Sequence, residues 1–230
     1  MRLPVLLSVP HAGLGIPQEV QRYCRLTPAQ ISEDGDEGAA DVYDLAAEVE
    51  AFATTDVARA IVDLNRPETD RRADGVVKTH TCMNVPVYDA FPPPNTIELL
   101  LERYYRPYHE RLRDLASTGI PLGIDCHTML AVGPPIGPLA GKERPRICIS
   151  NGLGITCQAD WFSIVSDGFR DAFGFEPALN EPFTGGYICR CHAAEIPWVQ
   201  IELSRAPFMD DEEKRSRVLE ALRMVCKRIG

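Results

Sequence analysis

Short apolar runs alternate with longer segments of helical spacing along the chain, and this pattern predicts a fold of the α/β class. Five apolar runs have the length of strands and are predicted as strands: residues 3–9, 58–64, 121–124, 146–149 and 198–203. Four segments are predicted as helices: residues 41–52, 96–116 (with Asn95 as N-cap), 159–173 and 210–229. Because no low-complexity linker interrupts this alternation, we expect residues 1–230 to form one domain.

Three segments between these elements lack a regular pattern. Residues 66–94 and 131–145 are rich in proline and glycine, and long irregular segments of a compact domain are usually functional. In the third segment, residues 184–192, Gly185 and Gly186 precede Tyr187 and Arg190. Two glycines before an aromatic and a basic residue predict a flexible loop that closes over a substrate.

The composition narrows the classes of partner. Lys and Arg number 24 against 33 Asp and Glu, so the formal charge is −9, which argues against a nucleic-acid-binding protein. A few local arginines could still bind a small anionic substrate. No apolar run approaches the roughly 20 residues of a membrane helix, and residues 1–10 predict a core strand better than a signal peptide. We therefore expect a cytoplasmic protein whose eight irregularly spaced cysteines are buried small side chains and not disulfides.

Polar side chains follow several of the predicted strands. His11 follows the first strand, Asn65 and Arg66 follow the second, and His127 follows the third. Ligand sites of open α/β sheets gather at the carboxyl ends of the strands. We therefore expect these residues to form one site, although each histidine taken alone could equally be satisfied by a neighbouring carbonyl group.

Two histidines with one carboxylate are the ligand pattern of a hydrolytic zinc site. The acidic cluster at residues 33–37 is the best local source of the carboxylate, and Asp34 and Asp36 both qualify. Asp125 projects to the same side of its strand as His127, so it could orient the imidazole or bind the metal itself. His192 is a further candidate ligand, although its place beside Cys189 and Cys191 also suits a substrate contact.

Glu202 lies inside an apolar run, where an unpaired carboxylate is costly, and this placement favours a general base over an outward-facing side chain. For an anionic substrate, Arg66 offers a guanidinium and Asn65 an amide beside it. Arg190 and Arg59 are further candidates for a second carboxylate or an oxyanion.

Six motifs in order then suggest a family. They are SVPHAG at 8–13, DEGAADVYD at 36–44, ARAIVDLNRP at 58–67, DCHTM at 125–129, NEPFTGGYI at 180–188 and QIELSR at 200–205. With these motifs the chain resembles the N-formylglutamate amidohydrolase family. The resemblance implies the three-layer fold of zinc carboxypeptidases and aspartoacylases, a central mixed sheet with helices on both faces.

The resemblance also implies roles for individual residues. His11, Asp36 and His127 match the ligands of one zinc ion per chain, Glu202 matches the water-activating glutamate, and the pair at 65 and 66 matches residues that bind the substrate carboxylate. The implied reaction is hydrolysis of an N-acyl amino acid, with N-formylglutamate as the first candidate. Two alternatives remain open: a zinc carboxypeptidase or amidase acting on peptides or other N-acyl compounds, and a non-catalytic binding protein on the same scaffold.

Overall fold

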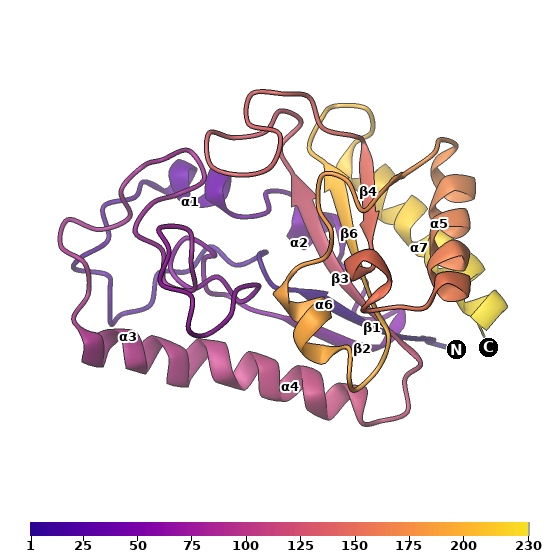
Figure 1. The fold of residues 1–230 in the computed structure, drawn as a ribbon, viewed down its shortest axis with the longest axis horizontal. Coiled ribbons are helices and arrows are strands. Elements are labelled where there is room, and N and C mark those ends of the chain that lie inside the picture. The colour runs from indigo at the N-terminus through magenta and orange to yellow at the C-terminus, as the bar shows by residue number, and fades with distance from the viewer. Residues whose placement is uncertain (230) are drawn as a thin grey trace.

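The computed structural model describes residues 1–229 and contains one six-stranded sheet with helices on both faces (Figure 1). The strand order is β2-β1-β3-β6-β4-β5, and all neighbours are parallel except β4 and β6. The strands are β1 (Leu3–Val9), β2 (Val49–Thr54), β3 (Leu122–Met129), β4 (Ile147–Ser150), β5 (Ala178–Leu179) and β6 (Trp198–Ser204). The helices are α1 (Pro28–Asp34), α2 (Ala39–Val42), α3 (Pro94–Leu100), α4 (Arg106–Ala116), α5 (Ala159–Phe173), α6 (Tyr187–His192) and α7 (Asp211–Ile229), with a π-helical turn at Leu101–Tyr105 and a 3-10 turn at Gly152–Gly154. The predicted α/β class and mixed sheet are confirmed.

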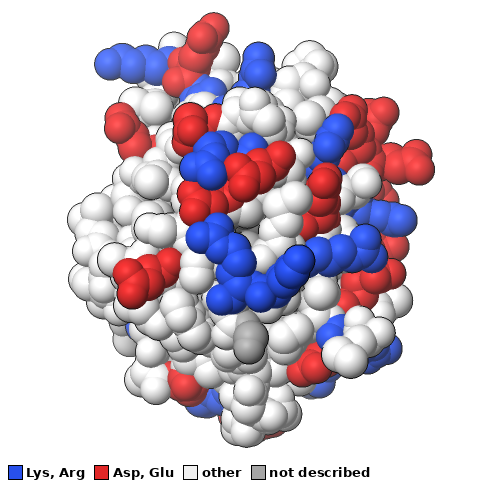
Figure 2. All heavy atoms as spheres, turned by 90° about the vertical axis from the view of Figure 1, so that its right-hand side faces the viewer, with Lys and Arg blue, Asp and Glu red and all other residues white. Residues whose placement is uncertain are grey.

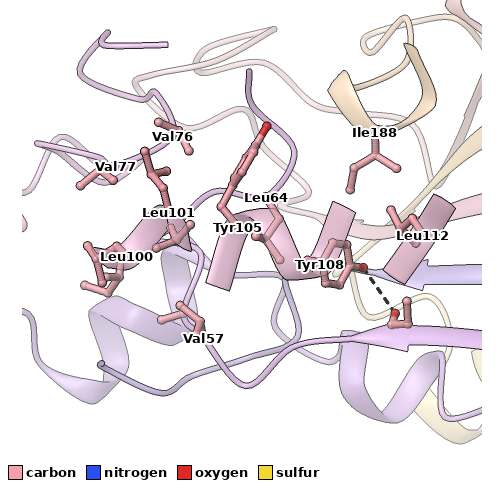
Figure 3. Packing of buried hydrophobic residues seen from close by; sticks show 14 of the residues in the cluster. Val57, Leu64, Val76, Val77, Leu100, Leu101, Tyr105, Tyr108, Leu112 and Ile188 are labelled. Carbon is pink, nitrogen blue, oxygen red and sulfur yellow. Dashed lines mark hydrogen bonds between the residues drawn. The ribbon is translucent and has the colours of Figure 1, made fainter. Parts of the chain in front are cut away.

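Each face of the sheet has its own hydrophobic core. Side chains alternate between the faces of a strand, so Leu6 of β1 joins one core while its neighbours Val5 and Leu7 join the other. The first core lies under α4 and α6 and includes Tyr105, Leu112 and Ile188 (Figure 3). The second lies under α2, α5 and α7. Burial on both faces explains why the central strands are continuous apolar runs.

The helix predicted for residues 41–52 is wrong. A single helical turn, α2, ends at Val42, and the strand β2 begins at Val49. In β2 the side chains of Val49, Ala51 and Ala53 are buried, while those between them are more exposed. This alternation has the period of a strand. The apolar residues of α2 and β2 lie at helical spacing in the sequence, although a turn separates the two elements.

The strand predicted for residues 58–64 is also wrong. The amides of Ile61 and Val62 both donate to the carbonyl of Ala58, so the chain turns there instead of extending. The segment is buried beside the sheet, because Ile61 and Leu64 belong to the core under α4. The residues of this segment are apolar because they are buried, and not because they form a strand.

Other boundaries differ by less. The structure confirms the strand at β1 and the helix at α5 over the predicted residues, while β3, β4 and β6 extend beyond their predicted carboxyl ends. The first long helix begins at Pro94 with Pro93 as its N-cap, so Asn95 does not have that role. The flexible loop predicted for residues 184–192 is irregular only up to Gly186, and the rest of it forms the helix α6. All eight cysteines are free, and five of them are buried, as expected: Cys126, Cys148, Cys157, Cys189 and Cys226.

The outer surface of α5 and α7 carries both signs of charge. Seen from the side of these helices, acidic and basic side chains lie next to one another (Figure 2). Arg228 of α7 and Asp167 of α5 form a salt bridge of 3.1 Å that joins the two helices. Among the described residues, no helix is both long and apolar enough to cross a membrane.

Candidate functional site

The carboxyl ends of β1 and β3 bring two histidines together. The strands are parallel neighbours, and His11 lies just beyond β1 while His127 lies on β3 near its end. Their ring centroids are 4.8 Å apart. Asp36, in the turn between α1 and α2, joins them because its amide donates to the carbonyl of His11 over 3.1 Å. All three side chains are buried.

The three side chains direct their donor atoms toward one point. Oδ2 of Asp36 lies 2.9 Å from Nδ1 of His127 and 3.5 Å from Nδ1 of His11. Among residues 1–229, Nδ1 of His11 is buried and has no hydrogen-bond partner. Burial would raise the pKa of Asp36, but the two imidazoles hold it well below its usual value. The site therefore presents two imidazole nitrogens and one ionised carboxylate.

A second layer of carboxylates holds the far side of each ring. Nε2 of His11 lies 2.9 Å from Oδ1 of Asp63, and Nε2 of His127 lies 2.9 Å from Oδ2 of Asp125. With the proton of each ring on Nε2, the lone pair of Nδ1 is available to a metal. The carboxylate partner also raises the basicity of that Nδ1 atom. Two oriented imidazoles, a carboxylate and a buried nitrogen without a partner fit a divalent metal such as zinc.

The geometry separates the three candidate aspartates. Asp34 is buried in an ion pair with Nζ of Lys78 at 2.8 Å, and its other oxygen accepts from the amide of Cys82. Asp125 contacts the outer nitrogen of His127, away from His11. Asp36 alone of these three lies between both Nδ1 atoms.

Glu202 reaches the same site from β6. It is paired in register with His127 on β3, and its side chain is buried. Gln200, two residues earlier on the same face, donates from Nε2 to Oε1 of Glu202 over 2.8 Å and accepts from the amide of Gly186. Burial raises the pKa of Glu202 to about 7, with the charge of Asp36 adding to the effect of burial. A carboxyl group with this pKa can exchange a proton near neutral pH.

The segment that carries Asn65 and Arg66 is fixed by a helix and not by a strand. Oη of Tyr105 donates to the carbonyl of Arg66 over 2.8 Å, and Nε2 of His109 donates to the carbonyl of Leu64 over 3.1 Å. These two hydrogen bonds flank Asn65 and hold it against the continuous helix formed by α3, the π-helical turn and α4. The side-chain nitrogen Nδ2 of Asn65 donates to Oδ2 of Asp125 over 3.1 Å. Asn65 is thereby tied to the carboxylate that holds His127.

Gly186 packs directly on the amide group of Asn65. A Cβ atom at this position would overlap the Asn65 side chain. We expect Gly186→Ala to displace that side chain, to lower kcat/KM, and to lower the free energy of unfolding by about 1–3 kcal/mol, as overpacking usually does. Chemical denaturation and steady-state kinetics measure the two effects.

The same alanine in an Asn65→Ala background is the control for this clash. Because the smaller side chain leaves room for the new methyl group, Gly186→Ala should cost much less stability there. Equal costs in both backgrounds would contradict the explanation.

A cavity of about 340 Å³ opens over these residues. Most of the predicted site residues line it: His11, Asp36, Arg59, Asn65, Arg66, His127, Arg190 and Glu202. Tyr187 is not among the lining residues, because α6 turns its ring toward His109 at a centroid distance of 5.7 Å. His192 lies away from the cavity too, with Nε2 2.9 Å from Nδ1 of His109.

Several residues of the site were not predicted from the sequence. Gln200 stands two positions before Glu202 in an apolar strand, so period-two spacing could have placed both on one face. Asp63 belongs to the segment predicted as a strand, and its contact with His11 depends on the turn that the structure has there. Arg144 and Lys78 line the cavity from irregular segments, where no periodicity marks them.

Comparisons with known proteins agree with this architecture. The sequence profile of the family described as "N-formylglutamate amidohydrolase" matches residues 3–209. The chain is similar to an N-formylglutamate deformylase of Pseudomonas putida, at 28% identity over 92% of this chain and 84% of that protein. The fold is similar to that of an N-formylglutamate amidohydrolase from Ralstonia eutropha JMP134, with a TM-score of 0.78 and 19% identity over 99% of this chain and 93% of that one. A protein from Agrobacterium tumefaciens gives a TM-score of 0.76 at 18% identity, over 99% of this chain and 91% of that one.

The profile match spans every element of the sheet and all of the residues that converge on the cavity. This chain therefore belongs to the N-formylglutamate amidohydrolase family.

Proposed function

We propose that this protein is a zinc-dependent amidohydrolase that cleaves N-formylglutamate to formate and glutamate. The observation that carries the proposal is the convergence of His11, Asp36 and His127 with the buried carboxyl of Glu202. The substrate is inferred from family membership and from the similarity to the deformylase of Pseudomonas putida. Residues 1–230 would act as one catalytic domain, and a cytoplasmic location stays a prediction from the sequence.

The donor set supports zinc as the metal. His11 and His127 would bind it through Nδ1 and Asp36 through a carboxylate oxygen, which leaves a position open for water or substrate. When bound, zinc supplies Lewis-acid chemistry: it acidifies a water molecule and polarises a carbonyl group. Asp63 and Asp125 keep both imidazoles in the required orientation.

Glu202 is proposed as the general base. Its ionised carboxylate accepts a proton from the attacking water, and the resulting carboxylic acid donates that proton to the leaving amine nitrogen. Gln200 fixes one of its oxygens, so the other is free to face the reacting groups. A pKa near 7 lets the same side chain accept and release the proton at neutral pH.

Basic side chains at the cavity wall would bind the substrate carboxylate. Arg66 donates from Nε and Nη2 to Asp74, which fixes its guanidinium and leaves Nη1 for the α-carboxylate, beside Asn65. Arg59 is held by Asp63 at 3.2 Å close to Asp36, a place that suits stabilisation of the oxyanion. Arg190 is a candidate for a second carboxylate, whereas Tyr187, whose ring faces His109, is not assigned a contact with substrate.

A panel of N-acyl compounds tests this proposal. Purified protein should release amine from N-formylglutamate when zinc is present and lose this activity in a chelator. N-acetylglutamate and a dipeptide with a glutamate side chain serve as comparisons. Preferential cleavage of the dipeptide would support the alternative of a peptidase, and failure to cleave any of the three with zinc bound would overturn the proposed function.

A further inference from the structure

The charges around the cavity are unevenly paired. Four of its six lysine and arginine side chains have a carboxylate partner within 4 Å: Lys78 with Asp34, Arg59 with Asp63, Arg66 with Asp74, and Arg205 with Asp36. For Arg144 and Arg190 no such partner exists within residues 1–229. The cavity thus holds two guanidinium groups whose charge the protein does not neutralise directly.

Arg144 is the more unusual of the two. Its Nε atom is buried and has no hydrogen-bond partner among the described residues. Only Nη2 is engaged, as a donor to the carbonyl of Pro138 over 2.8 Å. Burial lowers the pKa of Arg144 because the surroundings do not compensate the lost hydration. The side chain as a whole is half-buried, and a partly desolvated cation with a buried, unused donor is costly unless an anion completes it.

The surroundings of Arg144 hold its guanidinium in place. It lies over the ring of Phe183, 5.1 Å from the centroid, which restricts the planar group. The next residue, Thr184, accepts a hydrogen bond from Nη2 of Arg190 over 2.9 Å. Phe183 and Thr184 therefore connect the two unpaired arginines on one wall of the cavity.

We propose that Arg144, assisted by Arg190, binds the side-chain carboxylate of the substrate and thereby selects N-acyl derivatives of dicarboxylic amino acids. This inference rests on the proposed function, in which Arg66 takes the α-carboxylate and Glu202 serves the scissile amide. The planar guanidinium with its free donors matches a carboxylate, whereas a neutral amide would leave this half-buried cation without a counter-charge. Arg144 is thus a specificity-determining residue.

The test compares N-formylglutamate with N-formylglutamine, which has nearly the same shape but a neutral side chain. Wild-type enzyme should prefer N-formylglutamate in kcat/KM. In Arg144→Gln that preference should shrink by roughly 10- to 100-fold, the usual worth of a hydrogen bond to a charged group. Activity on N-formylglutamine should persist, which also shows that the variant is folded. Arg144→Lys should keep part of the preference.

Arg146→Gln is the matched control. Arg146 lies two residues away, outside the cavity lining, with its guanidinium over Phe175, and its loss should leave the preference unchanged. A wild-type enzyme that cleaves both substrates equally well would overturn the role of Arg144 while leaving the proposed function intact. So would an equal loss on both substrates in Arg144→Gln, because that result assigns Arg144 to the reacting amide. Absence of cleavage of any N-formyl amino acid would instead refute the proposed function itself.

Discussion

Replacement of Glu202 by glutamine should lower kcat by about 10³-fold, within the range of 10²–10⁴ that general acid–base catalysis contributes. Glutamine is nearly isosteric, but it cannot accept the proton of the attacking water. Since the hydrogen bond with Gln200 can be retained, we expect KM and the free energy of unfolding to change little. Steady-state kinetics over a range of pH are the measurement.

The pH profile separates a base from a structural residue. Only the ionised carboxylate accepts a proton, so kcat/KM of the wild type should fall as the pH drops below the pKa of Glu202. Because burial raises that pKa above the ordinary glutamate value of 4.5, the fall should begin closer to neutral pH. In Glu202→Gln the remaining activity should lose this acid limb.

Glu33 provides the matched control for this substitution. It is another glutamate that lines the cavity, on α1, but no role in proton transfer is assigned to it. Glu33→Gln should keep kcat within a few-fold of wild type, as is usual for a side chain outside the reacting groups. If Glu202→Gln turned over substrate at the wild-type rate, the proposed base would be refuted.

Removal of an imidazole donor should have a comparable effect through the metal. We expect His127→Ala to reduce zinc affinity by more than about 100-fold, since loss of an outer-shell partner alone costs roughly 10–100-fold. Wild-type protein should contain one zinc ion per chain, and its thermal midpoint should rise with added zinc because the ion binds only the folded state. Elemental analysis and a thermal melt measure both effects independently of turnover.

His80→Ala is the control for the metal experiment. His80 lies away from the cavity lining, and its Nδ1 lies 3.0 Å from the hydroxyl of Thr79. Zinc content should not change in this variant. Loss of zinc from a His192 variant, with His127→Ala still loaded, would contradict the assignment of the donor set.

The parts of the fold that follow a simple period could be predicted from the sequence. β1 and α5 were predicted because their apolar residues repeat in the manner of a buried strand and of one helical face. Residues 58–64 have the same composition as a strand, but they turn at Ala58 and are buried by the helix above them. The apolar composition of this segment indicates that it is buried. Its backbone conformation depends on contacts with residues far along the chain.

The candidate site shows the same division. His11, His127 and Glu202 were recognisable as polar residues at the ends of, or inside, apolar strands. The choice of Asp36 over Asp34 needed either the family resemblance or the structure, since only packing pairs Asp34 with Lys78. Arg144 lies on an irregular segment, where the position of a side chain depends on the loop and no periodicity applies.

The order of strands has a consequence for how the chain acquires activity during synthesis. Within residues 1–229, β6 is the last strand to be made, yet it lies between β3 and β4 and alone joins β4 and β5 to the rest of the sheet. The three proposed metal donors all precede residue 128, so a nascent chain could assemble them as soon as β1 and β3 pair. Glu202 arrives only with β6. The proposed base therefore enters together with the strand that completes the sheet, so full catalytic power depends on closure of the fold.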